Sequence, residues 1–185
     1  MIVLETDRLV LRRFTEADID ALAALHGDPA VMRYIDDGKP VPRDVVERDE
    51  LPRILNEYRT EFGQWAAEHN GEFVGWFALK PSTSVGLDGI ELGYRLRPAV
   101  WGRGFGTEGA RALVAMGFGE LGVARIGATT MTVNAGSRRV LEKAGLRLIR
   151  TFFEEWPVYL EGAEHGDVEY ALTRHEWVSA ATARP

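Results

Sequence analysis

The chain of 185 residues contains no cysteine and no long apolar run. Without cysteine it can form no disulfide, no thiolate metal site and no cysteine nucleophile. No apolar stretch approaches the roughly 18 residues that a membrane-spanning helix needs, so we expect no membrane association. Glu5 and Asp7 stand where the apolar core of a signal peptide would continue. We therefore expect a cytoplasmic protein.

Basic residues are in the minority, with 22 Lys and Arg against 28 Asp and Glu and a formal net charge of −6. Nucleic-acid binding requires clustered basic residues, so we expect no nucleic-acid partner. The same balance is compatible with a cationic partner such as an amine. Histidine is also scarce, and no two of the four have the spacing of metal ligands, so we predict no metal site: His26, His69, His165 and His175.

Apolar periodicity predicts one domain over residues 1–185. The strand patterns are Leu9–Phe14, Gln64–Glu68, Glu72–Leu79, Ile90–Arg97, Arg125–Thr130, Leu146–Phe153 and Val168–Leu172. The helical patterns are Thr15–His26, Arg43–Thr60, Ala110–Leu121 and Asn134–Ala144. Asn70-Gly71 is a strong hairpin turn, and Pro52 should kink or split the second helix. An antiparallel meander followed by a strand–helix alternation predicts an α/β (α+β) fold, with a mixed, mostly antiparallel sheet of about six to seven strands and helices on both faces.

The most informative stretch runs from Tyr94 to Leu121. A strand pattern ends at Arg97, because Pro98 cannot donate a ladder hydrogen bond. Three alternating glycines follow, and an apolar helical face then begins at Ala110. A strand, a glycine loop and a helix in this order build an anion site. Glycine lets the backbone approach a ligand closely, and the first helical N–H groups have no partner within the helix.

Neither common nucleotide-binding motif fits this loop. Gly104-x-Gly106-x-x-Gly109 formally matches the dinucleotide motif, which also needs a carboxylate about 20 residues later at the end of the next strand. The strand Arg125–Thr130 is instead followed by Met131-Thr132-Val133. A nucleotide P-loop needs Gly-Lys-Ser/Thr where this chain has Gly109-Ala110-Arg111. The loop therefore binds a different phosphate ligand or is a turn that binds nothing.

The run Gly102-Arg103-Gly104-Phe105-Gly106-Thr107-Glu108 resembles the acyl-CoA loop of the GCN5-related N-acetyltransferase (GNAT) family, written Q/R-x-x-G-x-G/A. The Q/R position is Trp101 here, which is usual in the branch that resembles the RimJ/RimL-type ribosomal-protein N-terminal acetyltransferases. The stretch Leu4–Arg12 resembles the opening of that branch, and Ser137–Gly145 resembles its second signature. The resemblance covers almost the whole chain.

This resemblance implies acetyl-CoA as the co-substrate, with its pyrophosphate on the loop and the helix that follows. Backbone N–H groups should make that contact, so the tryptophan at the Q/R position should not prevent it. The cofactor-binding residues that the resemblance implies are Leu96, Arg97, Trp101, Gly102, Arg103, Gly104, Phe105, Gly106, Thr107, Asn134 and Ser137.

Acetyl transfer to an amine needs a base, and we predict Glu91 for this role, directly or through a water. In the strand Ile90–Arg97, Glu91 shares one face with Gly93, Arg95 and Arg97. The family branch that the chain resembles has an acid at this point, on the face that lines the substrate cleft. The alternative is a solvated glutamate beside Arg95.

Asn134 and Ser137 open the helix after the next strand. Asn134 is a natural N-cap, and in the family the matching asparagine also touches the pantetheine arm of the cofactor. Ser137 lies on the apolar stripe of this helix. The family often uses a tyrosine here to protonate the departing thiolate. No tyrosine occurs between Asn134 and Arg150, so Ser137 is the nearest candidate acid, or only a first-turn residue.

The resulting hypothesis is an acetyl-CoA-dependent N-acetyltransferase that transfers acetyl directly to a primary amine of a protein N-terminus or a small molecule. The alternative is an acyl-CoA-binding sensor or partner module without turnover. Four acids predict a negatively charged mouth that favours cationic acceptors: Asp36, Asp37, Glu154 and Glu155. The identity of the acceptor is open, and so is a homodimer.

Overall fold

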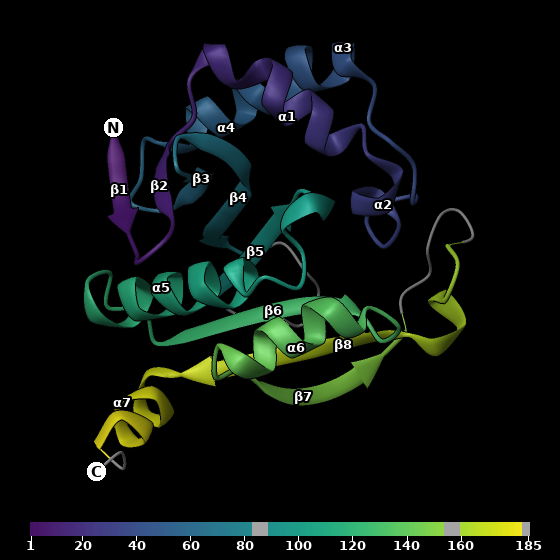
Figure 1. Ribbon diagram of the computed structural model, residues 1–185. Helices are drawn as coiled ribbons and strands as arrows, with labels where there is room; N and C mark the ends of the chain where they lie inside the picture. The colour runs from purple at the N-terminus through teal and green to yellow at the C-terminus, as the bar shows by residue number, and fades with distance from the viewer. Residues whose placement is uncertain (83–88, 154–159, 183–185) are drawn as a thin grey trace.

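The computed structural model describes residues 1–82, 89–153 and 160–182 (Figure 1). The strands are β1 Ile2–Glu5, β2 Val10–Arg13, β3 Gly63–His69, β4 Glu72–Pro81, β5 Ile90–Leu96, β6 Arg125–Met131, β7 Arg147–Phe152 and β8 Asp167–Thr173. The helices are α1 Ile19–His26, α2 Pro29–Met32, α3 Arg43–Val45, α4 Leu51–Glu57, α5 Phe105–Gly119, α6 Ala135–Lys143 and α7 Arg174–Thr182. The acids Glu154 and Glu155 lie outside the described residues.

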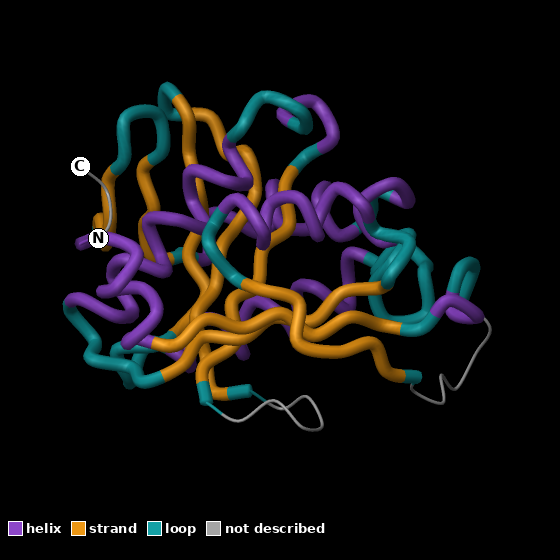
Figure 2. Tube along the Cα trace, turned by 90° about the horizontal axis from the view of Figure 1, so that it is seen from below, coloured by secondary structure: helices purple, strands orange, loops and turns teal. Residues whose placement is uncertain are grey.

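All eight of these strands form one sheet in the order β1-β2-β3-β4-β5-β6-β8-β7. Every neighbouring pair is antiparallel except β5 and β6. Figure 2 shows the strands as a twisted layer with helices packed against it. The predicted mixed, mostly antiparallel sheet is confirmed. It has one strand more than the expected six to seven, because Ile2–Glu5 adds an edge strand to β2.

The hairpin at Asn70-Gly71 is also confirmed. Both residues have positive φ, 54° and 78°, which is the backbone conformation of a tight turn between antiparallel strands. The second predicted helix is divided as Pro52 suggested. A π-helical segment, Val46–Glu50, separates α3 from α4, and Pro52 occupies the first turn of α4. A wider turn at this point accommodates a residue that cannot donate the usual backbone hydrogen bond.

Two apolar cores cover the two faces of the sheet. The face toward α1 and α4 includes Phe14, Leu22, Ile54 and Trp76. The opposite face packs against α5 and includes Phe77, Leu92 and Leu96. A Cβ at Gly109 of α5 would lie 2.2 Å from the Phe77 ring, so glycine is required for the helix to lie this close to the sheet. These contacts fix the start of α5 against the end of β5.

His26 at the end of α1 is buried in the first of these cores, as expected for a structural histidine. The indole of Trp76 donates a 2.9 Å hydrogen bond to Nε2 of His26. Because Nε2 must accept this bond, the ring proton is on Nδ1, which faces the Glu50 carboxylate. Burial alone would raise the pKa of Glu50, but the hydrogen bond from His26, together with the nearby positive charges such as those of Arg95 and Arg53, lowers it below its ordinary value. The hydrogen bonds from Trp76 to His26 and between His26 and Glu50 thus hold the indole at a fixed position on β4, opposite Arg95 of β5.

Candidate active site

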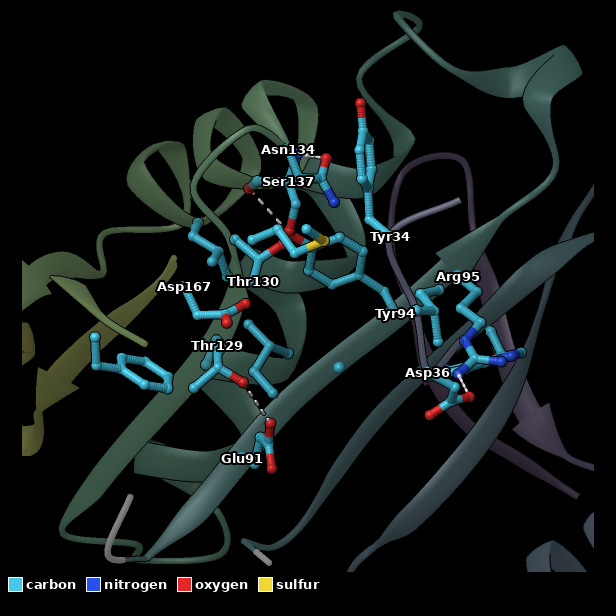
Figure 3. A pocket seen from close by; sticks show the side chains of 18 residues that line it. Tyr34, Asp36, Glu91, Tyr94, Arg95, Thr129, Thr130, Asn134, Ser137 and Asp167 are labelled. Atoms are coloured by element: carbon cyan, nitrogen blue, oxygen red, sulfur yellow. Dashed lines mark hydrogen bonds and ion pairs between the residues drawn. The ribbon is translucent and has the colours of Figure 1, made fainter. Parts of the chain in front are cut away.

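The parallel contact between β5 and β6 extends over two residue pairs, Ile90 with Ile126 and Glu91 with Gly127. Beyond these pairs the strands separate, and a cleft of about 360 Å³ opens between them. Figure 3 shows side chains from both strands, the segment after α2, the start of α6 and the start of β8 converging on it. The lining residues are Tyr34, Ile35, Asp36, Trp76, Glu91, Leu92, Gly93, Tyr94, Arg95, Ala128, Thr129, Thr130, Met131, Asn134, Ser137, Leu141, Phe152 and Asp167.

The glycine loop begins α5 next to this cleft. Gly102 and Gly104 have φ of 72° and 86°, a left-handed conformation that favours glycine. Gly104 is the N-cap of α5, so the N–H groups of the first turn have no partner within the helix. Thr107 of this turn lines a second hollow beside the loop. The predicted anion site therefore has the backbone geometry that phosphate binding requires.

Basic side chains surround this loop. The Arg8 guanidinium donates a 3.0 Å hydrogen bond to the carbonyl of Arg103 and lies 4.4 Å from the Phe105 ring centroid. Arg8, Arg111 and Lys143 all line the second hollow. Asp7 and Glu108 line it too, and Glu108 is ion-paired with Arg8, so Arg111 and Lys143 are the cations that most directly complement the phosphates of a coenzyme A molecule. The loop and its surroundings therefore fit an acyl-CoA.

The remaining predicted cofactor residues surround the loop in different ways. The Leu96 carbonyl accepts a 2.7 Å hydrogen bond from the Trp101 indole, which fixes the half-exposed tryptophan at the Q/R position. The Phe105 side chain is buried, so only its backbone is available to a ligand. A Cβ at Gly106 would lie 3.1 Å from Val140 of α6, which explains a glycine at this contact. Arg97 is exposed and donates a 3.2 Å hydrogen bond to the carbonyl of Phe73.

Glu91 lines the cleft at the point where β5 and β6 begin to separate. Its carboxylate accepts hydrogen bonds of 3.4 Å from Thr129 and 3.3 Å from Ser82. Figure 3 shows Glu91 and Thr129 together at one end of the cleft. The side chain is partly buried within a ligand-sized space, which agrees with the cleft-face interpretation more than with a fully solvated one.

Asn134 and Ser137 lie at the opposite end, on the first turn of α6 (Figure 3). The Asn134 side chain accepts a 3.1 Å hydrogen bond from the Ser137 N–H, so its predicted capping role is confirmed. The Ser137 hydroxyl lies 2.9 Å from the Tyr94 phenol. Burial raises the pKa of Tyr94 well above its ordinary value, so this phenol is protonated at neutral pH.

Tyr94 was not predicted as a site residue, because it is far from Ser137 in the sequence. The phenol comes from β5, 43 residues earlier in the chain. Alternation along β5 places Tyr94 with the apolar Leu92 and Leu96, so its sequence signal is that of a core residue. Asp167 was missed too, although it is buried at the start of β8 and lines the cleft. In the sequence, Asp167 is recognisable only as an acidic residue next to a strand pattern.

Arg95 lines the cleft on the side of α2, where Figure 3 places it beside Asp36. Its guanidinium lies 5.4 Å from the Trp76 ring centroid and 3.8 Å from the Asp36 carboxylate. Burial lowers the pKa of Arg95, as expected for a cation removed from water. The acids predicted at the mouth therefore include one that faces a cation, while Asp37 is not among the lining residues.

Within residues 1–82, 89–153 and 160–182, no three His, Asp or Glu side chains are grouped as metal ligands. None of the helices described there has the length and apolar character to cross a membrane.

Comparison with known proteins agrees with this geometry. The family model described as "Acetyltransferase (GNAT) domain" matches residues 8–147. The chain is 36% identical over 184 residues to the Aspergillus fumigatus FsC-acetyl coenzyme A-N(2)-transacetylase, covering 95% of this chain and 77% of the relative.

Solved structures show the same fold. A GNAT-family acetyltransferase from Bacillus anthracis superposes with a TM-score of 0.77 at 25% identity, covering 95% of this chain and all of the other. The RimL ribosomal L7/L12 alpha-N-protein acetyltransferase in complex with coenzyme A superposes with a TM-score of 0.75 at 20% identity, covering 94% and 98% of the two chains. The predicted family and the prediction of an acyltransferase are confirmed, and this chain belongs to the GNAT family of acetyltransferases.

Proposed function

We propose that the protein is an acetyl-CoA-dependent N-acetyltransferase that transfers acetyl directly to a primary amine. The observation that carries the proposal is the juxtaposition of the glycine loop at the start of α5 with the cleft that contains Glu91. The loop provides backbone N–H groups for the pyrophosphate, and the cleft provides an acid beside a ligand-sized space. Since the chain contains no cysteine, a cysteine-bound acetyl intermediate is excluded.

When bound, acetyl-CoA supplies the acetyl group as a reactive thioester. The residues implied by the family resemblance hold it: the loop from Trp101 to Thr107, with Leu96 and Arg97 before it and Asn134 beside the pantetheine arm. Arg111 and Lys143 add positive charge near the phosphates, whereas the charge of Arg8 is paired with Glu108. Excess positive charge at the N-terminus of α5 reinforces this attraction.

The ammonium loses two protons on its way to the amide, and the thiolate gains one. Glu91 would accept the first proton, directly or through a water, so that the free amine can attack the carbonyl carbon. The Ser137 hydroxyl, which the Tyr94 phenol contacts at 2.9 Å, would give a proton to the thiolate and regain one as the nitrogen releases its second. The two groups lie at opposite ends of the cleft, which leaves room between them for the carbonyl and the amine (Figure 3).

The proposed class of acceptor rests on the names of two relatives. The fungal relative's name specifies an N(2) nitrogen, and the RimL structure is of an alpha-N-protein acetyltransferase. Both names describe acetyl transfer to a nitrogen. We propose a RimJ/RimL-like enzyme that works in the cytoplasm as a monomer or homodimer.

The competing proposal is a module that binds acyl-CoA without turnover. Glu91 in the cleft favours the enzyme, because a sensor has no need of a base at that point. The test is to incubate the protein with acetyl-CoA and panels of amines and peptides, and to follow thiol release and acetylated products by mass spectrometry. Acetylated amine with stoichiometric thiol supports the proposal. Tight binding of acetyl-CoA with no product across the panels would favour the sensor.

A further inference from the structure

The cleft contains a cation that the acetyl-transfer chemistry does not use. Its charged lining residues are three carboxylates, Asp36, Glu91 and Asp167, and one guanidinium, Arg95. The Arg95 side chain is only 16% exposed. A guanidinium withdrawn from water is normally bound by several acceptors, because it carries five N–H donors and cannot lose its charge.

The partners of Arg95 are few. Within the part of the chain that the structure describes, its guanidinium makes one weak hydrogen bond, 3.5 Å to the sulfur of Met32. The Asp36 carboxylate lies 3.8 Å away, which is an ion pair but too long for a hydrogen bond. Asp36 itself is largely exposed, so its charge is screened by solvent. The Glu50 carboxylate, which is paired with His26, also stabilises the charge of Arg95 from a distance. Among the described residues, most N–H donors of Arg95 therefore have no acceptor and are available to a ligand in the cleft.

The position of this cation is well defined. Arg95 pairs with Trp76 across β4 and β5, and its guanidinium stacks on the indole. The indole is in turn held by its hydrogen bond to His26. Arg95 therefore presents its donors from a rigid support, which is the arrangement found where a planar anion is recognised.

Arg95 also lies on the same face of β5 as the predicted base, Glu91. Glu91, Gly93 and Arg95 alternate along one face, with Gly93 between the two charged side chains. Three residues lie between Glu91 and Arg95, so the rise of a β-strand places their Cα atoms about 13 Å apart. A ligand lying over Gly93 could place an amine near Glu91 and a second group near Arg95. The glycine loop starts α5 on the opposite face, which separates this cation from the phosphate site.

We propose that Arg95 binds an anionic group of the acceptor, so that the preferred substrates are primary amines that also carry a carboxylate or a similar anion. This inference rests on the proposed acetyltransferase function and names its substrate class. It replaces the expectation of a uniformly negative mouth: the carboxylates attract the ammonium end of the acceptor, and Arg95 holds its anionic end. Arg95 is then a specificity-determining residue.

The test uses matched probes that differ only in charge. They are ω-amino carboxylates of two to six carbons and α-amino acids, each compared with its carboxamide. For the best probe, we expect kcat/KM of the parent enzyme to favour the carboxylate by about 30-fold, the order found for a desolvated charge pair. Arg95→Gln should reduce this ratio to about one, and Arg95→Lys should retain part of it because the charge remains. The KM for acetyl-CoA should not change in either variant.

Asp36→Asn should change the affinity for the carboxylate probes in the opposite direction. Asp36 has a positive φ of 51°, which asparagine also tolerates, so the backbone is preserved. Removing its charge frees Arg95 from a competitor, and the affinity for the carboxylate probes should rise by about threefold. Arg59→Gln is the charge-matched control, because Arg59 is exposed after the end of α4 and outside the cleft.

Calorimetry with the same probes in the presence of coenzyme A makes the result independent of turnover, and thermal unfolding checks that each variant is folded. Equal binding of carboxylate and amide by the parent, or a preference that survives in folded Arg95→Gln, would overturn the inference. A rise in the KM for acetyl-CoA alone would assign Arg95 to the cofactor instead. Acetylation of amines without charge preference leaves the proposed function standing, whereas absence of all acetylation refutes that function.

Discussion

The Thr6 hydroxyl donates a 2.6 Å hydrogen bond to the carboxylate of Glu108, a residue 102 positions further along the chain. The Arg8 backbone N–H and guanidinium donate to the same carboxylate at 2.9 Å and 2.7 Å. The segment before β2 is therefore fastened to the first turn of α5, directly below the glycine loop. Two stretches that resemble the same family branch are parts of one structural unit.

We expect Glu108→Gln to lower the free energy of unfolding by about 2 kcal/mol at pH 7, since charge-assisted hydrogen bonds of this kind contribute roughly 1.5–3 kcal/mol. The amide keeps the shape, but its NH₂ group must face one of the three donors. Urea unfolding measures the loss. Glu120→Gln, exposed at the other end of α5, should change stability by less than about 0.5 kcal/mol. Equal effects of the two variants would contradict the anchoring role.

The hydrogen bonds to Glu108 also predict how the stability depends on pH. Burial alone would raise the pKa of Glu108, but the hydrogen bonds from Thr6 and Arg8 outweigh it and hold that pKa below its ordinary value. A carboxyl with a depressed pKa in the folded state stabilises the fold above its unfolded pKa, about 4.3. That contribution is lost as the pH falls through the folded value. The stability difference between parent and Glu108→Gln should therefore be constant near neutrality and shrink below about pH 4.

Gly104→Val tests the loop. A side chain at φ 86° is strained and would stand where the backbone meets the pyrophosphate, so the affinity for acetyl-CoA should fall by about tenfold or more. Gly122→Val is the strain control: Gly122 has φ 65°, and a Cβ there meets nothing within 4 Å. Both variants should lose stability, and only the first should lose affinity by calorimetry. Unchanged affinity in folded Gly104→Val would mean that the phosphates bind elsewhere.

Glu91→Gln should lower kcat about 100-fold or more with little change in acetyl-CoA affinity, because the amide keeps the shape and cannot take a proton. Asp167→Asn is the informative comparison, since Asp167 is the other partly enclosed carboxylate away from Arg95. Steady-state kinetics with a saturating amine measures both. A large loss of kcat in Asp167→Asn, with full activity in Glu91→Gln, would assign the role of base to Asp167 on β8.

Tyr94→Phe and Ser137→Ala should each lower kcat by about 3- to 30-fold if the two hydroxyls act as one proton-donating unit. The double variant should then be little slower than the worse single one, because groups that share a function are not additive. Single-turnover measurements follow the chemical step. Fully additive effects would show that the 2.9 Å contact is not used in common.

The fold could be predicted from sequence where a local pattern had one physical meaning. Asn70-Gly71 specifies a turn by itself, and Pro52 interrupts any regular helix. The edge strand Ile2–Glu5 was not recognised because it is short and only partly buried, so its side chains show no alternation. Its pairing with β2 depends on tertiary structure rather than on its own residues.

The site was predictable in part for the same reason. The glycine loop and the cap at Asn134 are local, and both lie where the sequence placed them. The contact between Tyr94 and Ser137 and the stacking of Arg95 on Trp76 join different elements. In sequence, Tyr94 resembles a core residue and Arg95 resembles half of a surface ion pair. The separation of β5 from β6 opens the cleft that both residues line.

The separation of β5 from β6 limits what side-chain substitutions can reveal about the site. Strand β5 is paired with β4 along its whole length, but with β6 only at Ile90 and Glu91. Past this point the backbone N–H and C=O groups of β5 that face β6 border the cleft, and an alanine substitution leaves these groups in place. An alanine scan of Leu92 to Leu96 would therefore not detect contacts between these backbone groups and a ligand. Proline, or a backbone ester in place of the amide, is the substitution that would reveal them.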